Sequence, residues 1–248
     1  MNDPYLLLWL EAPLQSWGHD SKFGRRGSLD FPTKSGVLGL LCCARGKGGE
    51  ERDWLAAWAD LDMRAVAYVS QDNQGKPLPR QPLMRDFQMV GSGYDDQDPW
   101  QTLLIPKTSE GKKAVGGGTK MTYRYYLQDM AYAVALQAPA DLVNDAATAL
   151  QSPAWDLYLG RKCCAPSEFI FQGIYADAKR ALQAGGKLAH EKQRTAVLRV
   201  LQGEHEGDIL TLNDVPLQFG PHKKYRDRRV TVQSQPHSEA FDAAPNYI

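Results

Sequence analysis

The order of the apolar segments constrains the fold of this chain more than any other feature. Residues 5–10 form an apolar run of strand length, and residues 36–44 are apolar on nearly every side, which is typical of a buried helix. Further strands are predicted at 64–70 and 131–137. Strands and helices of this kind in one chain predict a mixed α+β fold.

Helical segments separate these strands. Ser35 is predicted to be the N-cap of the first helix, and apolar residues at helical spacing predict a second helix at 54–61. A third helix is predicted at 142–150, capped by Asp141. With a fourth strand at 156–159, the order of elements becomes that of the ferredoxin-like βαββαβ fold.

A long insertion, residues 71–123, separates the second and third predicted strands and contains five prolines and three consecutive glycines. An irregular segment of this length within a domain is usually functional or else disordered. We therefore predict a domain at 1–160 that carries this insertion, a smaller and mainly β part at 161–233, and a loose tail at 234–248. Within the C-terminal part, strands are expected at 169–175, 195–201 and 230–233, with a short helix around 177–183.

Charge is balanced in amount but uneven in place. The 248 residues include 29 basic and 29 acidic ones, so the net charge argues neither for nor against a nucleic-acid partner. Basic residues concentrate at 107–124 and 223–229, and acidic ones at 50–62, 95–98 and 204–214. Such separation can line a cationic groove on a neutral protein, although solvated loops give the same pattern.

The four cysteines form two adjacent pairs, 42–43 and 163–164, without the C-x-x-C spacing that metal sites prefer. We interpret them as reduced thiols of a cytoplasmic protein, and we expect neither a metal nor a cofactor. The apolar run at 5–10 is too short for the core of a signal peptide, and no run has the length of a membrane span.

Motifs of enzymes are weak. Residues 116–120 read Gly-Gly-Gly-Thr-Lys, but Lys and Thr stand in the wrong order for a P-loop and no strand leads into them. The five histidines show no metal-ligand spacing, and no G-x-S-x-G motif is present. The sequence therefore does not favour a kinase or a nucleotidase.

Two polar patterns are compatible with RNA. Arg25, Arg26 and Lys34 flank a loop that ends at a predicted helix N-terminus, where unpaired N–H groups and the helix dipole favour a phosphate. Residues 121–126 interleave three tyrosines with Arg124 beside the basic stretch, and such rings can stack on single-stranded bases. The alternatives are a solvated basic loop and an ordinary sheet surface.

Longer motifs resemble one family. The segments YLLLWLEAPLQSWG at 5–18 and FPTKSGVLGLL at 31–41 resemble the opening of the CasD family, the RAMP-superfamily subunits of the type I-E CRISPR effector Cascade. LMRDFQMVG at 83–91 is similar to the start of the family's thumb insertion, and TYRYYLQD at 122–129 to its return into the third strand. LYLGRKC at 157–163 resembles a turn in the second half, and the resemblance extends from residue 5 to about residue 173.

The resemblance implies a ferredoxin-like domain with a protruding thumb and a smaller C-terminal part. It also implies a subunit that binds the five-prime handle of the CRISPR RNA (crRNA) beside a backbone subunit and a large target-recognising subunit, and that meets target DNA through the assembled complex. No membrane partner is expected. Members of the type I-E branch do not cut RNA, whereas a type I-C branch does so with a Tyr, Lys and His set.

Lys120 is the lysine nearest to such a set, but no histidine lies between residues 20 and 189, so a general acid–base pair is missing from the expected groove. A non-catalytic subunit is therefore our leading interpretation. A metal-independent endoribonuclease that uses His19 or Tyr123, and a scaffold that contacts only protein, are the alternatives.

Twelve residues are expected at the RNA site. The residues expected to hold phosphates are Arg25, Arg26, Lys34 and Ser35, and those expected to shape the adjoining loop are Gln15 and Trp17. The residues expected to line the base of the thumb are Arg85, Lys120, Arg124 and Tyr125, and those expected at a second turn are Arg161 and Lys162.

Overall fold

The computed structural model describes residues 3–19, 21, 24–90, 97–102, 107–108, 110–112 and 120–234. The glycine-rich run at 116–119 and the expected tail beyond Ser234 lie outside the described residues.

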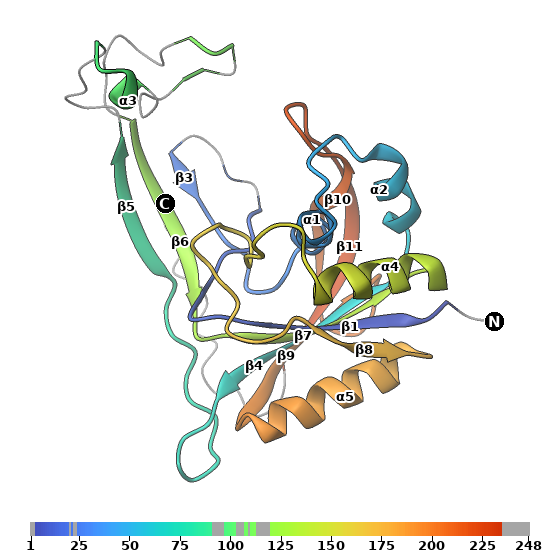
Figure 1. Cartoon of the computed structure of the whole chain (residues 1–248). Helices are drawn as coiled ribbons and strands as arrows, with labels where there is room; N and C mark the ends of the chain where they lie inside the picture. Colours follow the sequence, from blue (N-terminus) through green and yellow to red (C-terminus); the bar gives the residue numbers. More distant parts are fainter. Residues whose placement is uncertain are drawn as a thin grey trace.

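A seven-stranded sheet forms the centre of the fold, with the strand order β10-β11-β9-β4-β7-β1-β8 (Figure 1). Every neighbouring pair in it runs antiparallel. The strands are β1 (Tyr5–Glu11), β4 (Met63–Ser70), β7 (Ala131–Gln137), β8 (Phe171–Tyr175), β9 (Arg194–Gln202), β10 (Asp208–Gln218) and β11 (Lys224–Ser234).

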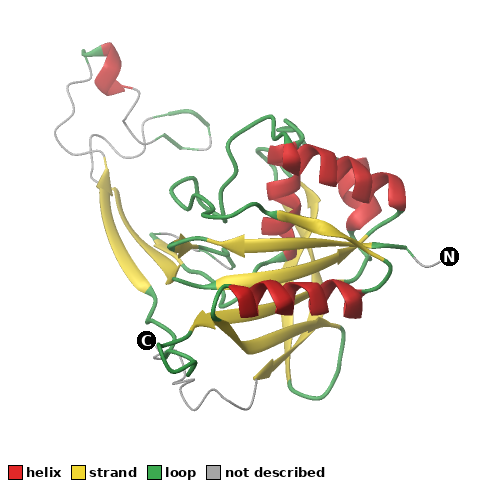
Figure 2. Ribbon diagram, turned by 60° about the horizontal axis from the view of Figure 1, so that its bottom comes forward, coloured by secondary structure: helices red, strands yellow, loops and turns green. Residues whose placement is uncertain are grey.

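Helices cover both faces of this sheet. Figure 1 shows α1 (Lys34–Ala44), α2 (Arg52–Trp58) and α4 (Ala140–Gln151) on one face and α5 (Ala178–Glu191) on the other, and Figure 2 shows α5 lying along the sheet. The packing of α5 is close, because a Cβ atom at Gly185 would lie 2.6 Å from the Cβ of Ala133 on β7. A side chain larger than hydrogen at this position would push the helix away from the strand.

The two-sided cover explains why the first apolar run does not alternate with polar residues. Leu6, Leu8 and Leu10 belong to the core on the side of α1 and α4. Leu7 and Trp9 belong to the core on the side of α5. Because successive side chains of a strand point to opposite faces, a strand that is buried on both faces is apolar at every position.

Several predicted elements need correction. Residues 156–159 form no strand. The strand that pairs with β1 is instead β8, which begins later in the chain, at Phe171. Thr33, not Ser35, is the N-cap of α1, because the Thr33 Oγ1 accepts from the Gly36 N–H at 3.1 Å. Pro139 takes the N-cap position of α4, which places Asp141 in the first turn.

The strands expected in the C-terminal part extend the central sheet. β9 pairs with β4 as well as with β11, so these strands join the same sheet as β1. The helix expected around 177–183 continues to Glu191, where α5 ends. β10 was not predicted, because the residues of its first half are exposed and lack an apolar alternation.

A second sheet contains β2 (Leu14–Gln15), β3 (Arg25–Arg26), β5 (Met84–Val90) and β6 (Lys120–Gln128). β5 and β6 pair antiparallel from Met84↔Tyr126 to Val90↔Lys120, and this two-stranded ribbon projects away from the central sheet (Figure 1). β3 pairs parallel with β6 near its middle. The insertion at 71–123 is therefore not irregular throughout, since it contributes β5 and the start of β6.

Candidate nucleic-acid interface

One face of the β5–β6 ribbon is exposed and unusually apolar. The pairing register places Arg85 opposite Tyr125, Phe87 opposite Tyr123, and Met89 opposite Met121. These six residues are called the ribbon face below. Phe87 is 50%, Met89 59%, Met121 57% and Tyr123 42% exposed. Large apolar side chains that gather on a surface in this way usually mark a binding site.

Rings and cations on the ribbon face are arranged in contact. The rings of Phe87 and Tyr123 have centroids 5.2 Å apart and an interplanar angle of 39°. The guanidinium of Arg85 lies 5.7 Å from the Tyr123 ring, and that of Arg25, from β3, lies 5.1 Å from the Tyr125 ring. A base could stack on such rings while its phosphate meets the neighbouring guanidinium groups.

The opposite face of the ribbon serves the protein interior. Tyr126 is buried, and burial raises the pKa of its hydroxyl. Because side chains alternate along β6, Arg124 lies on the face opposite to Tyr123 and Tyr125. The expected group of thumb-base residues is therefore divided between two faces. The backbone of Lys120 opens β6 at the far end of the ribbon from Tyr126.

Arg161 holds the base of the ribbon together. Its guanidinium donates to the carbonyl of Tyr125 at 3.1 Å and to the carbonyl of Arg26 at 2.8 Å, and it lies 4.6 Å from the ring of Tyr126. These contacts join β3, β6 and the turn at 157–163. The guanidinium thus has a structural role, while the neighbouring Lys162 is exposed beside it.

The turn that carries Arg161 requires glycine at position 160. Gly160 has a φ of +91°, and a Cβ atom there would lie 1.7 Å from the carbonyl oxygen of Ser16. The Ser16 N–H also donates to the Leu159 carbonyl at 3.1 Å. The turn is therefore fixed directly against the loop that follows β1.

Gln15 and Trp17 shape that loop from the inside. Both are buried, and the Gln15 Nε2 donates to the carbonyls of Met130 and Leu10 at 2.6 and 3.3 Å. The Trp17 Nε1 donates to the Gln15 Oε1 at 3.2 Å. The Trp17 ring lies so close to Gly36 that a Cβ atom there would be 2.8 Å from it. Neither side chain presents a polar group to solvent.

Lys34 is placed differently from the sequence-based expectation. The side chain is 0% exposed, and its Nζ donates to the carbonyls of Ala59 at 2.9 Å and Leu61 at 2.6 Å. Burial, reinforced by the nearby Arg228, lowers the pKa of the Lys34 ammonium to about 8. A lysine held inside the core in this way does not reach a phosphate in solvent.

The N-terminus of α1 already has an anionic partner. The Asp214 Oδ2 accepts from the Lys34 N–H at 2.7 Å, and both Asp214 oxygens accept from Arg228 at 2.7 and 2.9 Å. The interpretation of this helix end as a phosphate site is therefore corrected, because an internal carboxylate satisfies it. Of the residues assigned to phosphates, Arg25 and Arg26 remain at the surface.

The basic cluster at 223–229 is largely neutralised. Arg226, Arg228 and Arg229 form ion pairs with Asp60, Asp214 and Glu204, in that order. These partners come from the two acidic stretches at 50–62 and 204–214, which the fold brings beside β11. Lys223 instead lines a groove described next.

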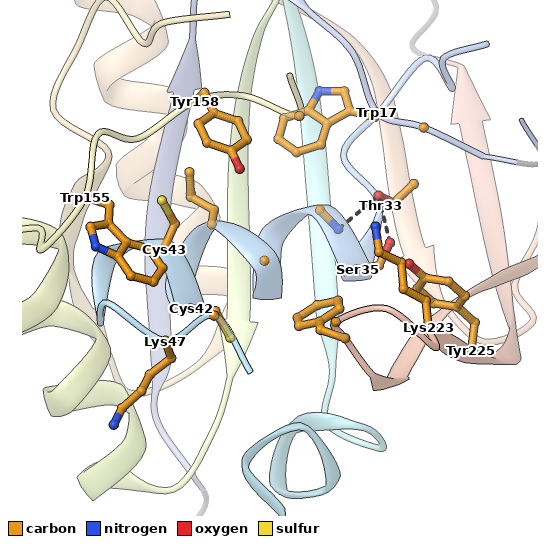
Figure 3. A pocket seen from close by; sticks show the side chains of 18 of the residues that line it. Trp17, Thr33, Ser35, Cys42, Cys43, Lys47, Trp155, Tyr158, Lys223 and Tyr225 are labelled. Atoms are coloured by element: carbon orange, nitrogen blue, oxygen red, sulfur yellow. Dashed lines mark hydrogen bonds between the residues drawn. The ribbon is translucent and has the colours of Figure 1, made fainter. Parts of the chain in front are cut away.

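A groove with a volume of about 500 Å³ lies over α1 (Figure 3). Its walls are the loop after β1, the turn at 155–160, the loop after α1, and the hairpin between β10 and β11. Trp17 and Ser35 line it, so these predicted residues contribute to a concave surface, though not as phosphate ligands. The contributions of Trp155 and Tyr225 were not predicted, because only the tertiary fold brings their segments together.

Among the residues that the structure describes, no three side chains of His, Cys, Asp or Glu gather in a way that could hold a metal ion. His190 lies on α5, on the face of the sheet opposite to α1. Within the same described residues, no helix has the length and apolar character needed to cross a membrane.

The fold and the ribbon face together define a mixed α+β protein that presents aromatic and cationic side chains along a projecting ribbon. The model of the family described as CRISPR-associated protein (Cas_Cas5) matches residues 5–231. The chain therefore belongs to this family, as the opening motifs indicated.

Individual relatives agree with this assignment. The CRISPR system Cascade subunit CasD of Escherichia coli (strain K12) is 28% identical over 201 residues, which cover 77% of this chain and 83% of that protein. A chain of a structure titled "CRISPR RNA-guided surveillance complex" is similar with a TM-score of 0.67 and 27% identity, over 93% of this chain and 89% of that one. A structure titled "Crystal structure of Cas protein" shares the fold, with a TM-score of 0.56 and 23% identity over 98% of this chain and 100% of that one.

Proposed function

We propose that this chain is a non-catalytic subunit of a type I-E CRISPR surveillance complex of the Cascade kind, and that it binds the five-prime handle of the crRNA. Membership of the Cas5 family supports the proposal, as does the similarity to a relative named as a Cascade subunit. The neighbours in such an assembly are a backbone subunit and a large target-recognising subunit, target DNA is met through the complex, and the site of action is the cytoplasm.

The ribbon face is the observation that carries the RNA-binding part of the proposal. Phe87, Met89 and Met121 are exposed to water on this two-stranded ribbon, so their apolar surface adds nothing to the stability of the isolated protein. Stacked bases would cover these side chains, and Arg85 would meet phosphates. The proposal also assigns the parts of the fold. The strands β4-β7-β1-β8 with their helical connections are the ferredoxin-like unit, and the β5–β6 ribbon is the thumb. Residues 161–233 are a distinct part in sequence only, because they supply β8 of this unit and their other strands belong to the same central sheet.

Cleavage is the less favoured function. Tyr123 lies on the ribbon face, but its hydroxyl would need a partner that takes up or supplies a proton. Of the described histidines, His205 lies beside the turn between β9 and β10, where its Nε2 is 3.0 Å from the Gln202 carbonyl, while His190 lies on α5 and His222 lies between β10 and β11. His19 lies beside β3, because its carbonyl oxygen is 4.0 Å from a Cβ atom built at Gly27, and it therefore stays the candidate base of the alternative function. Binding is favoured over cleavage because the relative that supports the assignment is named as a Cascade subunit.

The test compares RNA retention by the parent protein and by a Phe87→Ala, Tyr123→Ala double variant. The RNA is the single-stranded CRISPR repeat RNA, and the matched control is Phe169→Ala, because Phe169 is 88% exposed but precedes β8 in the central sheet. We expect the double variant to lose about 2–6 kcal/mol of binding free energy, on the basis of about 1–3 kcal/mol for each of two stacked bases. The control should bind as the parent does.

The same incubation without metal tests the absence of catalysis. Full-length RNA recovered after incubation would agree with the proposal. Discrete products that disappear in the Tyr123→Phe or the His19→Ala variant would instead show the ribonuclease. No RNA retention by the parent would favour a scaffold that contacts only protein.

A further inference from the structure

The groove over α1 is lined in a way that suits one kind of ligand. Figure 3 shows Trp155 and Lys47 at one end, Lys223 and Tyr225 at the other, and Tyr158 above the helix between them. The lining residues include these two lysines and no aspartate or glutamate. The groove is therefore cationic at both ends and aromatic along its length.

Glycine is concentrated in this groove. Seven of its twenty lining residues are glycine, out of 22 glycines in the whole chain. Three of the seven have reasons inside the protein, since Gly160 is pressed against Ser16, Gly36 is pressed against the Trp17 ring, and Gly220 has a φ of +77°. At two more, Gly48 and Gly49, a built Cβ atom would have tight contacts of 3.2 and 3.3 Å. Glycine elsewhere in the lining leaves backbone N–H and C=O groups open to a ligand that approaches closely.

Gly39 is the informative position. It lies inside α1, where its φ is helical, and a Cβ atom there would meet only the Phe219 ring at an ordinary contact distance of 3.9 Å. Glycine in a helix interior is destabilising relative to alanine. Neither backbone geometry nor packing within the protein accounts for glycine at this position, whereas a ligand lying on this face of α1 does.

We propose that the groove over α1 holds one unpaired nucleobase of the bound RNA. Trp155 and Tyr158 stack on the base, the glycine backbone approaches its edge, and Lys47 and Lys223 meet the phosphates on either side. The volume of about 500 Å³ accommodates a nucleotide. Trp155 is 50% exposed, so its ring is accessible from the groove. This inference rests on the proposed binding of guide RNA and adds a second RNA contact away from the ribbon face.

The test fills the groove from its floor. Gly39→Leu places a side chain on the face of α1 where the base would lie. Gly186→Leu is the matched control, because Gly186 is also inside a helix, has no atom within 4 Å of a built Cβ, and lies on α5 across the sheet. With the single-stranded repeat RNA, we expect Gly39→Leu to weaken binding at least tenfold and Gly186→Leu to leave it unchanged. Gly39→Ala should raise the melting temperature.

A second measurement uses fluorescence and needs no change to the helix. Stacking of a base on Trp155 should quench tryptophan emission when RNA is added, and the quenching should be smaller in a Trp155→Phe variant that binds RNA equally well. This readout remains valid if Gly39→Leu does not fold. Equal quenching in the parent and the variant would overturn the stacking of a base on Trp155.

The outcomes separate the two proposals. If the parent and Gly39→Leu bind RNA equally while the ribbon-face double variant binds weakly, the proposed function stands and the groove inference falls. If the parent retains no RNA, both fall. If Gly39→Leu keeps its RNA affinity but no longer assembles with the other subunits, the groove holds a protein side chain, and the nucleobase is refuted.

Discussion

Replacing Lys34 distinguishes a structural role from a role in binding phosphate, because the sequence and the structure predict opposite effects on stability and on RNA binding. As a phosphate ligand, it would affect RNA binding and leave stability unchanged. In the structure it is buried and donates to two carbonyls, those of Ala59 and Leu61, so the Lys34→Met variant leaves both acceptors without a donor while keeping the volume filled. We expect a loss of about 2–6 kcal/mol in the free energy of unfolding, at about 1–3 kcal/mol for each of the two unsatisfied buried acceptors.

The assay is urea unfolding followed by circular dichroism, together with RNA binding measured on the folded protein. Lys162→Met is the matched control, because Lys162 is exposed on the turn beside Arg161 and should have little effect on stability. RNA affinity of Lys34→Met should stay within about twofold of the parent, since Lys34 touches no solvent. A stability change below about 0.5 kcal/mol combined with a fall in RNA affinity would refute the structural role.

The pH dependence of the same pair of proteins gives an independent check. Burial lowers the pKa of Lys34 from 10.5 to about 8 in the folded protein, so between these two values the unfolded chain binds a proton that the folded protein does not. Stability of the parent relative to Lys34→Met should therefore rise with pH in this window, by about 1.4 kcal/mol for each pH unit. Below pH 8 both states are protonated and the difference should be flat. A neutral amine retains N–H donors for both carbonyls, so deprotonation does not break the contacts.

Two further predictions concern the turn at 157–163 and the ribbon. Gly160→Ala should destabilise the protein by at least about 3 kcal/mol in urea unfolding, because φ is +91° and a Cβ atom would lie 1.7 Å from the Ser16 carbonyl oxygen. The control is Gly75→Ala, at a φ of +77° but with open space around the built Cβ atom. Equal losses of stability in both variants would contradict the packing argument. Neutralising Arg85 and Lys162 together should reduce the log–log salt slope of RNA binding by about 1.4, at about 0.7 for each phosphate contact on a single strand; an unchanged slope would mean that neither side chain meets a phosphate.

The buried elements could be predicted from the sequence because burial leaves a local mark. The runs at 5–10, 36–44, 64–70 and 131–137 all fall within observed strands or helices, since both faces of the central sheet are covered. The opening motifs fall at the contact between Trp17 and Gly36, a place where the chain tolerates few other residues. The local pattern of apolar residues was therefore sufficient to predict those elements whose side chains are buried in the core.

Elements that depend on distant partners could not be predicted in the same way. β5 places Phe87 and Met89 on a face that is open to solvent, so its alternation did not indicate a strand of the core. The environment of Lys34 is set by Ala59, Leu61 and Asp214, which lie 25, 27 and 180 residues further along the chain. A basic residue before a helix reads the same in sequence whether such partners surround it or not.

The balance of charge is resolved by which charges the fold pairs. Arg226, Arg228 and Arg229 meet acidic partners, and their cluster contributes less positive surface than its sequence indicates. Four other cations form no ion pair with any residue that the structure describes. They are Arg85 and Lys162 near the ribbon, and Lys47 and Lys223 at the groove. A protein without net charge can thus present cations to RNA, because folding neutralises one set of basic residues and leaves the other at the ribbon and the groove.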